Sequence, residues 1–542
     1  MTTSQRRYLV ATAPVTGAAI MIIEILGAKM LAPYIGTSHF VWTAQIAVTM
    51  IALAAGYALG GFIADRAAPR GGGASQPLAS GNPKSAIRNP QSGGGGSAAA
   101  LYLCVLGAAL ALVLGTLVRE PVALACLQLG LRAGSFLAAT ILFFVPLCLL
   151  ATVPPILVRN LAAGMDSIGR TVGRLSAIST IGSVLGTLAI GYVLIPNFSN
   201  TTNMLATAAV LALVALGYLL TWRAIKPGAS VFIVFAILAI GVPAFLQGAL
   251  RIPPGRFTEI HRANSNYGLL QVLDSKEEPL RFYLNDLLVQ NIYIPRTRQS
   301  AAEFTHMLHG LARAYTPQIR DVLCIGMGVG IVPMQFAAEG AQVDIVEINP
   351  GVVPLAEKFF DFDRARIRTL AINDGRPWLA SGNTQYDTII LDAFLGDAPP
   401  SHLMTREAFA EMKRHLRPGG TLVINSFGTL EAGKVFFTAS LEKTLAAVFA
   451  TVRLHTLDDG NNYYVATDRS DARPLRAFDI SKVPPHLRDG VAATFGSIRT
   501  AVNSPGAIVL TDDYNPVEYH DARNREHTRR TLALTLLAGQ EE

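Results

Sequence analysis

The 542-residue chain has few cysteines and few charged residues, and each shortage removes a class of protein. Its four cysteines, Cys104, Cys126, Cys148 and Cys324, have neither paired nor metal-ligand spacing. We therefore expect small buried thiols, and no metal site. Charged residues make up only 15% of the chain, although the formal net charge is +7. No dense lysine or arginine face with interleaved aromatic side chains is visible, so we expect no nucleic-acid partner.

Acidic residues are almost absent from residues 1–250, which are rich in alanine, leucine, isoleucine, valine and glycine. Residues 251–542 have the mixed charge of a soluble domain. Seven apolar runs in the first half approach or exceed the about 20 residues that cross a bilayer as a helix. They cover residues 8–33, 40–64, 98–118, 134–158, 175–195, 203–222 and 229–248. We predict an N-terminal polytopic, all-α membrane bundle of about seven spans, in the cell membrane, with the lipid bilayer as its partner.

The chain divides into three predicted domains. Residues 1–250 form the transmembrane helical domain, in which the glycine-, serine- and proline-rich residues 70–97 are a disordered linker loop. Residues 251–316 form a small β-rich subdomain followed by a helix, and residues 317–542 form the catalytic domain.

Loop charges predict an orientation for the bundle. Most basic residues at the ends of the apolar runs lie on one side, which the positive-inside rule places in the cytoplasm. They are Arg6, Arg7, Arg66, Arg70, Lys84, Arg88, Arg159, Arg170, Arg174, Arg223 and Lys226, against Arg119 and Arg132 on the other side. Seven spans then put the C-terminal domain outside, whereas a nucleoside cofactor made in the cytosol requires it inside. An eighth span, or one run that fails to cross, removes this conflict.

Two features lie inside the apolar runs. Glu24 is deep in the first run, with Lys29 five residues later. A charge at that depth faces a substrate path or ligand site, or belongs to a structural ion pair that locks helices together. The second feature runs from Gly56 through Gly60 and Gly61 to Asp65 and Arg66, and it resembles the glycine-rich, Asp-Arg loop signature of major-facilitator transporters. Close helix packing through small residues explains its glycines equally well.

The second half has the pattern of an α/β domain. Residues 257–291 alternate as antiparallel strands do, and a helix is expected at about 300–315. From residue 321, strands alternate with helices, which predicts a parallel doubly wound sheet. The expected strands are DVLCIG, QVDIVEI, IRTLAI, YDTIILDAF, GTLVINSF, TVRLHTL and NNYYVAT, and the helices include VVPLAEKFF, TREAFAEMKRHL and VFFTASLEKTLAAVF.

The candidate site lies at the carboxyl ends of these strands, where ligands of such sheets bind. Its residues are Gly326, Gly328 and Gly330 after the first strand, Glu347 at the end of the second, then Asp374, Gly375 and Asp392. Glycines let the backbone approach a ligand, and a carboxylate there accepts both ribose hydroxyls. Each residue alone also suits a tight turn, a solvated strand end or a helix cap. Together they predict a nucleoside-binding site.

These residues, in this order, resemble spermidine synthases, and in particular their membrane-fused bacterial members. In the first half, the resemblance rests on Glu24, residues 32–38, Trp42 and residues 173–196. In the second half it rests on residues 265–267, 284–286, Gln290, 303–308, the glycine-rich core and 510–518. It implies a Rossmann-like, methyltransferase-type fold with a small antiparallel β subdomain, and subunits paired in a homodimer.

The resemblance also implies roles. Gln290 contacts the thioadenosine part of the cofactor, Glu347 binds the ribose hydroxyls, Asp374 and Gly375 hold the adenine, and Asp392 is the catalytic carboxylate. The implied enzyme is a transferase of polyamine biosynthesis. It moves an aminopropyl group from decarboxylated S-adenosylmethionine to a polyamine or other amine and releases methylthioadenosine.

The chain departs from soluble spermidine synthases where they hold the diamine. Val329 replaces an aspartate in the glycine-rich loop, residues 304–305 replace a Tyr-His pair, and residues 392–395 replace an Asp-Ser/Thr-Ser/Thr-Asp loop. The candidates to compensate are Asp286, His306, Asp397 and His402. Two alternative functions therefore stay open: methyl transfer from S-adenosylmethionine, and a nucleoside-sensing domain that regulates a transport-like membrane bundle.

Overall fold

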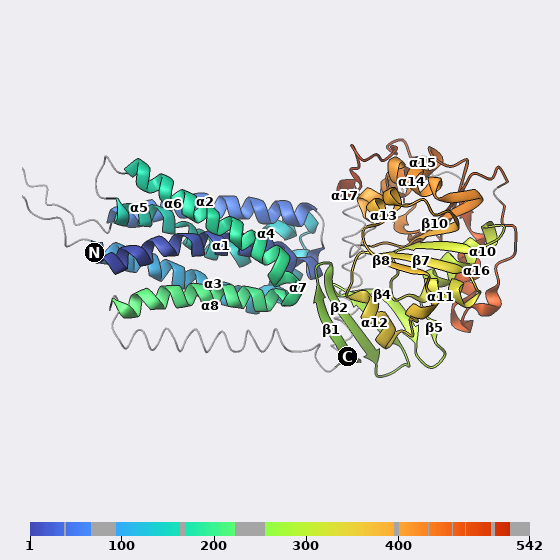
Figure 1. Ribbon diagram of the computed structural model, residues 1–542, viewed down its shortest axis with the longest axis horizontal. Coiled ribbons are helices and arrows are strands. Elements are labelled where there is room, and N and C mark those ends of the chain that lie inside the picture. Colours follow the sequence, from blue (N-terminus) through green and yellow to red (C-terminus); the bar gives the residue numbers. More distant parts are fainter. Residues whose placement is uncertain are drawn as a thin grey trace, which may run out of the picture. The chain divides into compact units, whose positions relative to one another are not determined.

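The computed structural model describes residues 1–36, 39–66, 94–162, 168–222, 255–394, 400–431, 433–457, 459–471, 473–499 and 504–520. The chain divides into two compact units. One contains Met1–Ala32 and Phe40–Leu250, and the other contains Pro33–His39 and Arg251–Glu542. The first unit is helical and the second is an α/β domain, as Figure 1 shows.

Long apolar helices build the first unit. They are α1 (Thr3–Ile35), α2 (His39–Arg66), α3 (Gly94–Leu127), α4 (Leu131–Ala151), α5 (Val153–Leu161), α6 (Ile168–Ala189), the π-helical η2 (Ile190–Leu194), α7 (Ile195–Asn197) and α8 (Asn200–Thr221). Within the described ranges, six stretches are long and apolar enough to cross a membrane, and they contain the first six predicted runs. The seventh run, 229–248, lies outside the described residues, as does most of the predicted linker. Because α3 begins at Gly94, the linker ends earlier than the predicted residue 97.

Glycines bring α2 against α4 and the start of α5. A Cβ on Gly56 would lie 2.3 Å from the carbonyl oxygen of Cys148, and one on Gly60 would lie 2.6 Å from that of Thr152. Backbones come this close only where the side chain is absent. Close packing therefore explains Gly56 and Gly60 of the transporter-like motif but not Gly61, where a Cβ would meet nothing within 4 Å.

Glu24 makes a contact between two helices of the bundle. Its carboxylate on α1 accepts a hydrogen bond from the Thr49 hydroxyl on α2. One turn away on α2, the buried carboxamide of Gln45 packs on Gly27 of α1, where a Cβ would lie 2.7 Å from it. This contact joins two helices, but its partner is a neutral hydroxyl and not the cation of the predicted ion pair.

A small antiparallel sheet opens the second unit, as the alternating pattern predicts. Its strands β1 (Phe257–Ser265), β2 (Gly268–Ser275), β3 (Arg281–Asn285), β4 (Leu288–Ile294) and β5 (Gln299–Ser300) follow one another in order. The turn between β3 and β4 places Asp286 and Leu287 at φ 48° and 64°. The Asp286 carboxylate accepts the N–H of Leu269 at 2.9 Å, which ties this turn to β2.

Eight strands form the large sheet. They are β6 (Asp321–Ile325), β7 (Gln342–Glu347), β8 (Thr369–Ile372), β9 (Tyr386–Leu391), β10 (Leu416–Thr429), β11 (Thr451–His455), β12 (Asp459–Thr467) and β13 (Ile498–Arg499), in the order β13-β11-β12-β10-β9-β6-β7-β8. All seven predicted strands are present. The prediction of a parallel sheet is correct from β6 to β10 but wrong at the other end, where β12 runs antiparallel to β10 and β11. Residues 456–458 alone join β11 to β12, and so short a connection joins antiparallel neighbours.

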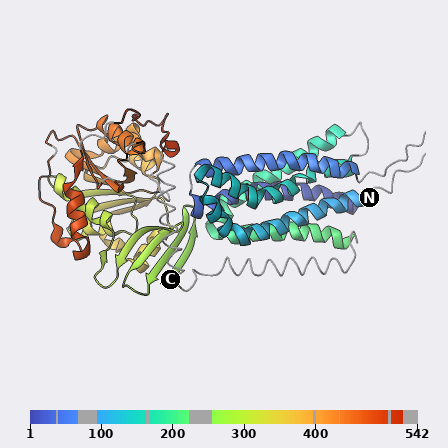
Figure 2. The ribbon, with the colours of Figure 1, turned by 180° about the vertical axis from the view of Figure 1, so that it is seen from behind.

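Helices cover both faces of the large sheet (Figure 1, and from behind in Figure 2). The first face packs on α10 (Glu303–Tyr315), α11 (Ile331–Ala338), α12 (Val352–Phe359) and α16 (Arg488–Gly496). The second face packs on α13 (Gly375–Ser381), α14 (Arg406–Arg414) and α15 (Phe436–Ala446). Short turns η3 (Arg364–Arg366), η4 (Ser401–Leu403), η5 (Ile480–Lys482) and η6 (Pro485–Leu487) and the helix α17 (Val517–His520) complete the described elements. The cysteines are free thiols, of which Cys126 and Cys324 are buried and Cys104 and Cys148 half-buried.

Gly330, the last residue of the glycine turn (residues 326–330) that follows β6, and Gly340 offer a matched test of packing. Their φ angles are 85° and 86°, but a Cβ on Gly330 would lie 2.3 Å from the Phe362 ring, whereas one on Gly340 would meet nothing within 4 Å. Gly340→Ala should cost about 1–2 kcal/mol through backbone strain. Gly330→Ala should cost about 1–3 kcal/mol more through overpacking. Thermal unfolding of the purified full chain should show the larger loss of Tm for Gly330→Ala, and equal losses would contradict this packing.

Candidate functional site

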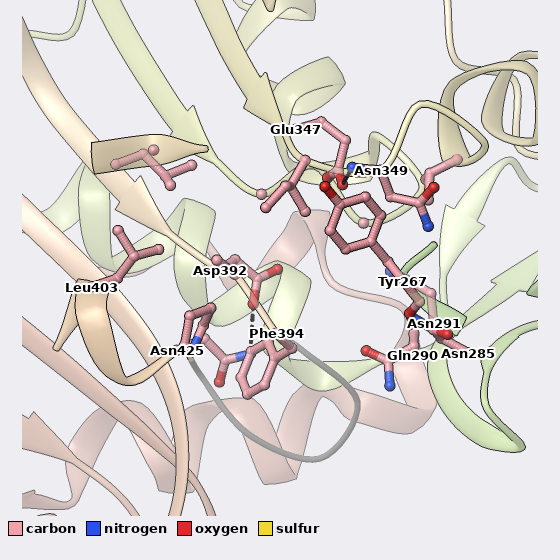
Figure 3. Close-up of a pocket in the computed structure, with 18 of the residues that line it drawn as sticks. Tyr267, Asn285, Gln290, Asn291, Glu347, Asn349, Asp392, Phe394, Leu403 and Asn425 are labelled. Carbon is pink, nitrogen blue, oxygen red and sulfur yellow. Dashed lines mark hydrogen bonds between the residues drawn. The ribbon is translucent and has the colours of Figure 1, made fainter. Parts of the chain in front are cut away.

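A cavity of about 430 Å³ lies at the carboxyl ends of β6, β7 and β9, between the large sheet and the small one (Figure 3). This volume is in the range of small-molecule sites. Seven of the eight predicted site residues line it: Gln290, Gly326, Gly328, Glu347, Asp374, Gly375 and Asp392. Gly330 is the exception, because it begins α11 and packs on Phe362 instead.

The glycine turn after β6 has a different function at each position. Gly326 has φ 85°, and a Cβ there would lie 2.4 Å from the carbonyl oxygen of Asp392. It therefore lets the chain after β6 touch the chain after β9. Gly328 has φ 51° and faces open space, with the Asn291 carboxamide nitrogen 3.9 Å from the position of its missing Cβ. This stretch of backbone is accessible to a ligand.

Glu347 ends β7 and holds the glycine turn in place. Its Oε2 accepts the N–H of Met327 at 3.0 Å, and its Oε1 accepts the N–H of Asn349 at 2.8 Å. Burial raises the pKa of Glu347, and these backbone N–H groups oppose that rise. Each carboxylate oxygen can accept a further hydrogen bond, so the side chain can still bind a pair of hydroxyls.

Asp374 caps the start of α13. Its Oδ1 accepts the N–H of Arg376 at 2.9 Å, and its Oδ2 lies 2.9 Å from Nε2 of His402. The next residue, Gly375, lets α13 approach β6, because a Cβ there would lie 2.8 Å from the Ile325 side chain. A polar edge and a close helix terminus thus form one end of the cavity.

Asp392 follows β9 and faces the cavity (Figure 3). Its Oδ1 accepts a hydrogen bond from Nδ2 of Asn425 at 2.9 Å. Burial raises the pKa of Asp392 to about 6; the Asn425 hydrogen bond opposes this rise, and the charge of Glu347 adds to it. Such a carboxylate is ionised at neutral pH, yet is basic enough to accept a proton from a bound group.

Several cavity residues were missed by the sequence reasoning. Asn425 and Asn461 come from β10 and β12, and Phe394 and Phe427 face each other with ring centroids 5.2 Å apart. Asn425 could have been recognised from the sequence, because it is a polar residue near the carboxyl end of an apolar strand. Nothing in the local sequence marks the phenylalanines, because their meeting depends on the pairing of β9 with β10.

The residues suggested as replacements for a diamine site have other partners. His306 lies outside the cavity lining, with Nε2 3.0 Å from the Ser300 carbonyl oxygen, and burial lowers its pKa. Asp286 holds the β3–β4 turn, and His402 contacts Asp374. The fourth, Asp397, lies outside the described residues.

Known proteins resemble parts of this chain. Residues 302–457 match the family described as spermine/spermidine synthase domain. A polyamine aminopropyltransferase of Vibrio vulnificus is 37% identical over 145 residues, 26% of this chain and 46% of the relative. An N-terminal histidine N-methyltransferase of Emericella nidulans is 26% identical over 296 residues, 47% of this chain and 50% of the relative.

A crystal structure described as a probable spermidine synthase from Corynebacterium glutamicum aligns with a TM-score of 0.38 at 18% identity, covering 48% of this chain and 97% of the other. The chain spans about half the length of the curated relatives it matches. The match to the spermine/spermidine synthase model lies in the C-terminal part of the chain, and the apolar N-terminal helices lie outside it.

Removal of the Glu347 carboxylate should destabilise the glycine turn even without ligand. Glu347→Ala leaves two backbone N–H groups without their acceptor, and an unsatisfied buried donor costs about 1–3 kcal/mol. Glu347→Gln keeps one carbonyl acceptor and should lose less. Thermal unfolding of the full chain at neutral pH measures this, and an unchanged Tm for Glu347→Ala would show that the carboxylate does not hold the turn.

Proposed function

We propose that the synthase domain transfers an aminopropyl group from decarboxylated S-adenosylmethionine to a polyamine or other amine, with release of methylthioadenosine. The observation that carries the proposal is the position of Asp392, a carboxylate of raised pKa that faces the same cavity as Glu347 and the glycine turn. The similarity to polyamine aminopropyltransferases supports it.

The proposed chemistry needs a neutral amine more than it needs an activated leaving group. The amine nitrogen attacks the methylene beside the sulfonium, the carbon–sulfur bond breaks, and its electron pair stays on sulfur as methylthioadenosine leaves. Alkylamines are mostly protonated at neutral pH. Asp392 binds the acceptor ammonium, aligns its nitrogen with the methylene and takes its proton.

The other predicted residues hold the nucleoside part in this proposal. The free acceptor positions of Glu347 bind the ribose hydroxyls, and Gly326 and Gly328 admit the ligand to the backbone. Gln290 contacts the thioadenosine portion from β4. Asp374 and Gly375 border the adenine, with Asp374 oriented by its contact with His402.

The proposal is tested by incubating the purified full chain with decarboxylated S-adenosylmethionine and a panel of diamines, polyamines and monoamines. We expect methylthioadenosine to appear in step with an aminopropylated product for at least one amine. A panel that yields none, with a protein that still binds the nucleoside, would refute aminopropyl transfer.

Asp392→Asn should separate chemistry from binding. We expect turnover to fall by about 10²–10⁴-fold, the usual loss on removal of a general base. Calorimetric affinity for decarboxylated S-adenosylmethionine should stay within a few-fold. Glu277→Gln, at an exposed side chain of the β2–β3 turn, is the control. If Asp392→Asn lost binding but kept its rate per bound complex, the assigned role would be wrong.

The pH dependence of the parent enzyme follows from the same group. Because Asp392 accepts the proton only when ionised, the rate should fall as pH drops through its pKa of about 6. Asp392→Asn should lack this acidic limb in its residual rate. A parent profile that stays flat through this range would contradict Asp392 as the base.

Methyl transfer from S-adenosylmethionine is the second candidate. It is favoured by the alignment with the N-terminal histidine N-methyltransferase, which extends over 296 residues. Comparison of the two cofactors by calorimetry distinguishes the reactions, since a methyltransferase must accommodate the methionine carboxylate. Clear preference for the carboxylated form, with S-adenosylhomocysteine as product, would replace the first proposal.

A membrane location is part of the proposal. Six helices among the described residues are apolar and long enough to cross a bilayer, so we infer that they anchor the domain. Use of a cytosolic nucleoside cofactor would place the domain on the cytoplasmic side.

A further inference from the structure

Two carboxamides connect Asp392 to a strand that lies two strands away in the large sheet. Nδ2 of Asn461 donates to Oδ1 of Asn425 at 3.1 Å, and Nδ2 of Asn425 donates to Oδ1 of Asp392 at 2.9 Å. These hydrogen bonds run from β12 across β10 to the end of β9.

The sheet register brings the three side chains together. Ile424 pairs with Leu391 in the parallel β10–β9 ladder, which places Asn425 beside Asp392. Phe427 pairs with Asn461 in the antiparallel β10–β12 ladder. Asn461 is therefore the diagonal neighbour of Asn425, on the same face of the sheet.

The hydrogen bonds from Asn461 to Asn425 and from Asn425 to Asp392 form a relay. The chemistry of the groups fixes its direction. An ionised carboxylate only accepts hydrogen bonds, so Asn425 must turn its amide NH₂ toward Asp392 and its carbonyl away. That carbonyl is buried with the rest of Asn425, which is 3% exposed, and Asn461 supplies its donor. A flipped Asn425 would oppose its carbonyl to the carboxylate and its NH₂ to the NH₂ of Asn461. Both ends of the relay thus select the same orientation.

We propose that Asn461 is a positioning residue for the transfer reaction, acting through Asn425 to hold Oδ1 of Asp392 and so direct Oδ2 at the acceptor nitrogen. The inference rests on the proposed function of Asp392 as proton acceptor. Among the residues that the structure describes, no hydrogen-bond partner is seen for Oδ2. One carboxylate oxygen is therefore fixed by the protein, and the other is presented to the cavity.

The other titratable groups around Asp392 do not stabilise its ionised form. Cys324 on β6 and Tyr463 on β12 have pKa values raised by burial, and both stay neutral at neutral pH. Glu347 on β7 opposes ionisation of Asp392, and the Asp374–His402 pair lines the far part of the cavity. Within the described residues, Asn425 is the group whose hydrogen bond favours the ionised form. Loss of its orientation should make Asp392 harder to ionise.

The test compares the full-length parent with Asn461→Ala and with the nearly isosteric, uncharged Asn461→Leu, neither of which can donate to Asn425. Both should lower kcat about tenfold or more, the scale of one lost hydrogen bond in a buried network, and leave cofactor affinity nearly unchanged. Both should also displace the acidic limb of the pH–rate profile to higher pH. Asn383→Ala, at an exposed asparagine before β9, is the control and should change neither.

A second readout does not depend on turnover. The infrared difference between each protein and its Asp392→Asn derivative titrates the Asp392 carboxylate directly. We expect a higher midpoint in both Asn461 variants than in the parent. Equal midpoints in correctly folded variants would overturn the relay whether or not the enzyme turns over. A parent that releases no methylthioadenosine would instead refute the proposed function. The titration of the Asp392 carboxylate would still show whether the relay exists.

Discussion

The site depends on one close approach, between the chain that leaves β6 and the chain that leaves β9. Gly326 makes it possible, because any Cβ at that position would collide with the carbonyl of Asp392. The same turn is held from the other side by Glu347, which accepts the N–H of Met327. Two carboxylates from different strands thereby share one cavity beside a backbone segment in which every second residue is a glycine. The glycines are needed first for the close backbone contacts at the edge of the sheet. Access for a ligand follows from those contacts.

This arrangement also makes the two carboxylates different from each other. Glu347 is bound by backbone N–H groups at both oxygens, which stabilises it as a fixed acceptor. Asp392 has one carboxamide donor, and burial together with the charge of Glu347 raises its pKa to about 6. One carboxylate is suited to holding a neutral polar ligand, and the other to exchanging a proton.

Much of the fold could be predicted because its signals are local. The seven strands of the large sheet, the glycine turn and the small antiparallel sheet each follow from short patterns of apolar residues and turns. The antiparallel strand β12 could not be predicted in the same way, since its insertion between β10 and β11 is a choice of non-local partner. The site residues also fall into those that the local sequence reveals and those that it does not. Glu347 and Asp392 end apolar strands and stand out, whereas Asn461 reaches Asp392 only through the register of three strands.

The charge of the cavity bears on how a cationic acceptor can be held. Within the described part of the chain, its acidic lining residues are Glu347, Asp374 and Asp392. Backbone groups engage the first and His402 engages the second, so Asp392 is the carboxylate best placed to meet an ammonium group. Phe394 and Phe427 line the same cavity, and aromatic faces attract cations and also pack against methylene chains. An acceptor bound there would gain its charge contact at the reacting nitrogen and its remaining contacts from rings and carboxamides. Its specificity would then depend more on the shape of the alkyl part than on a second charge.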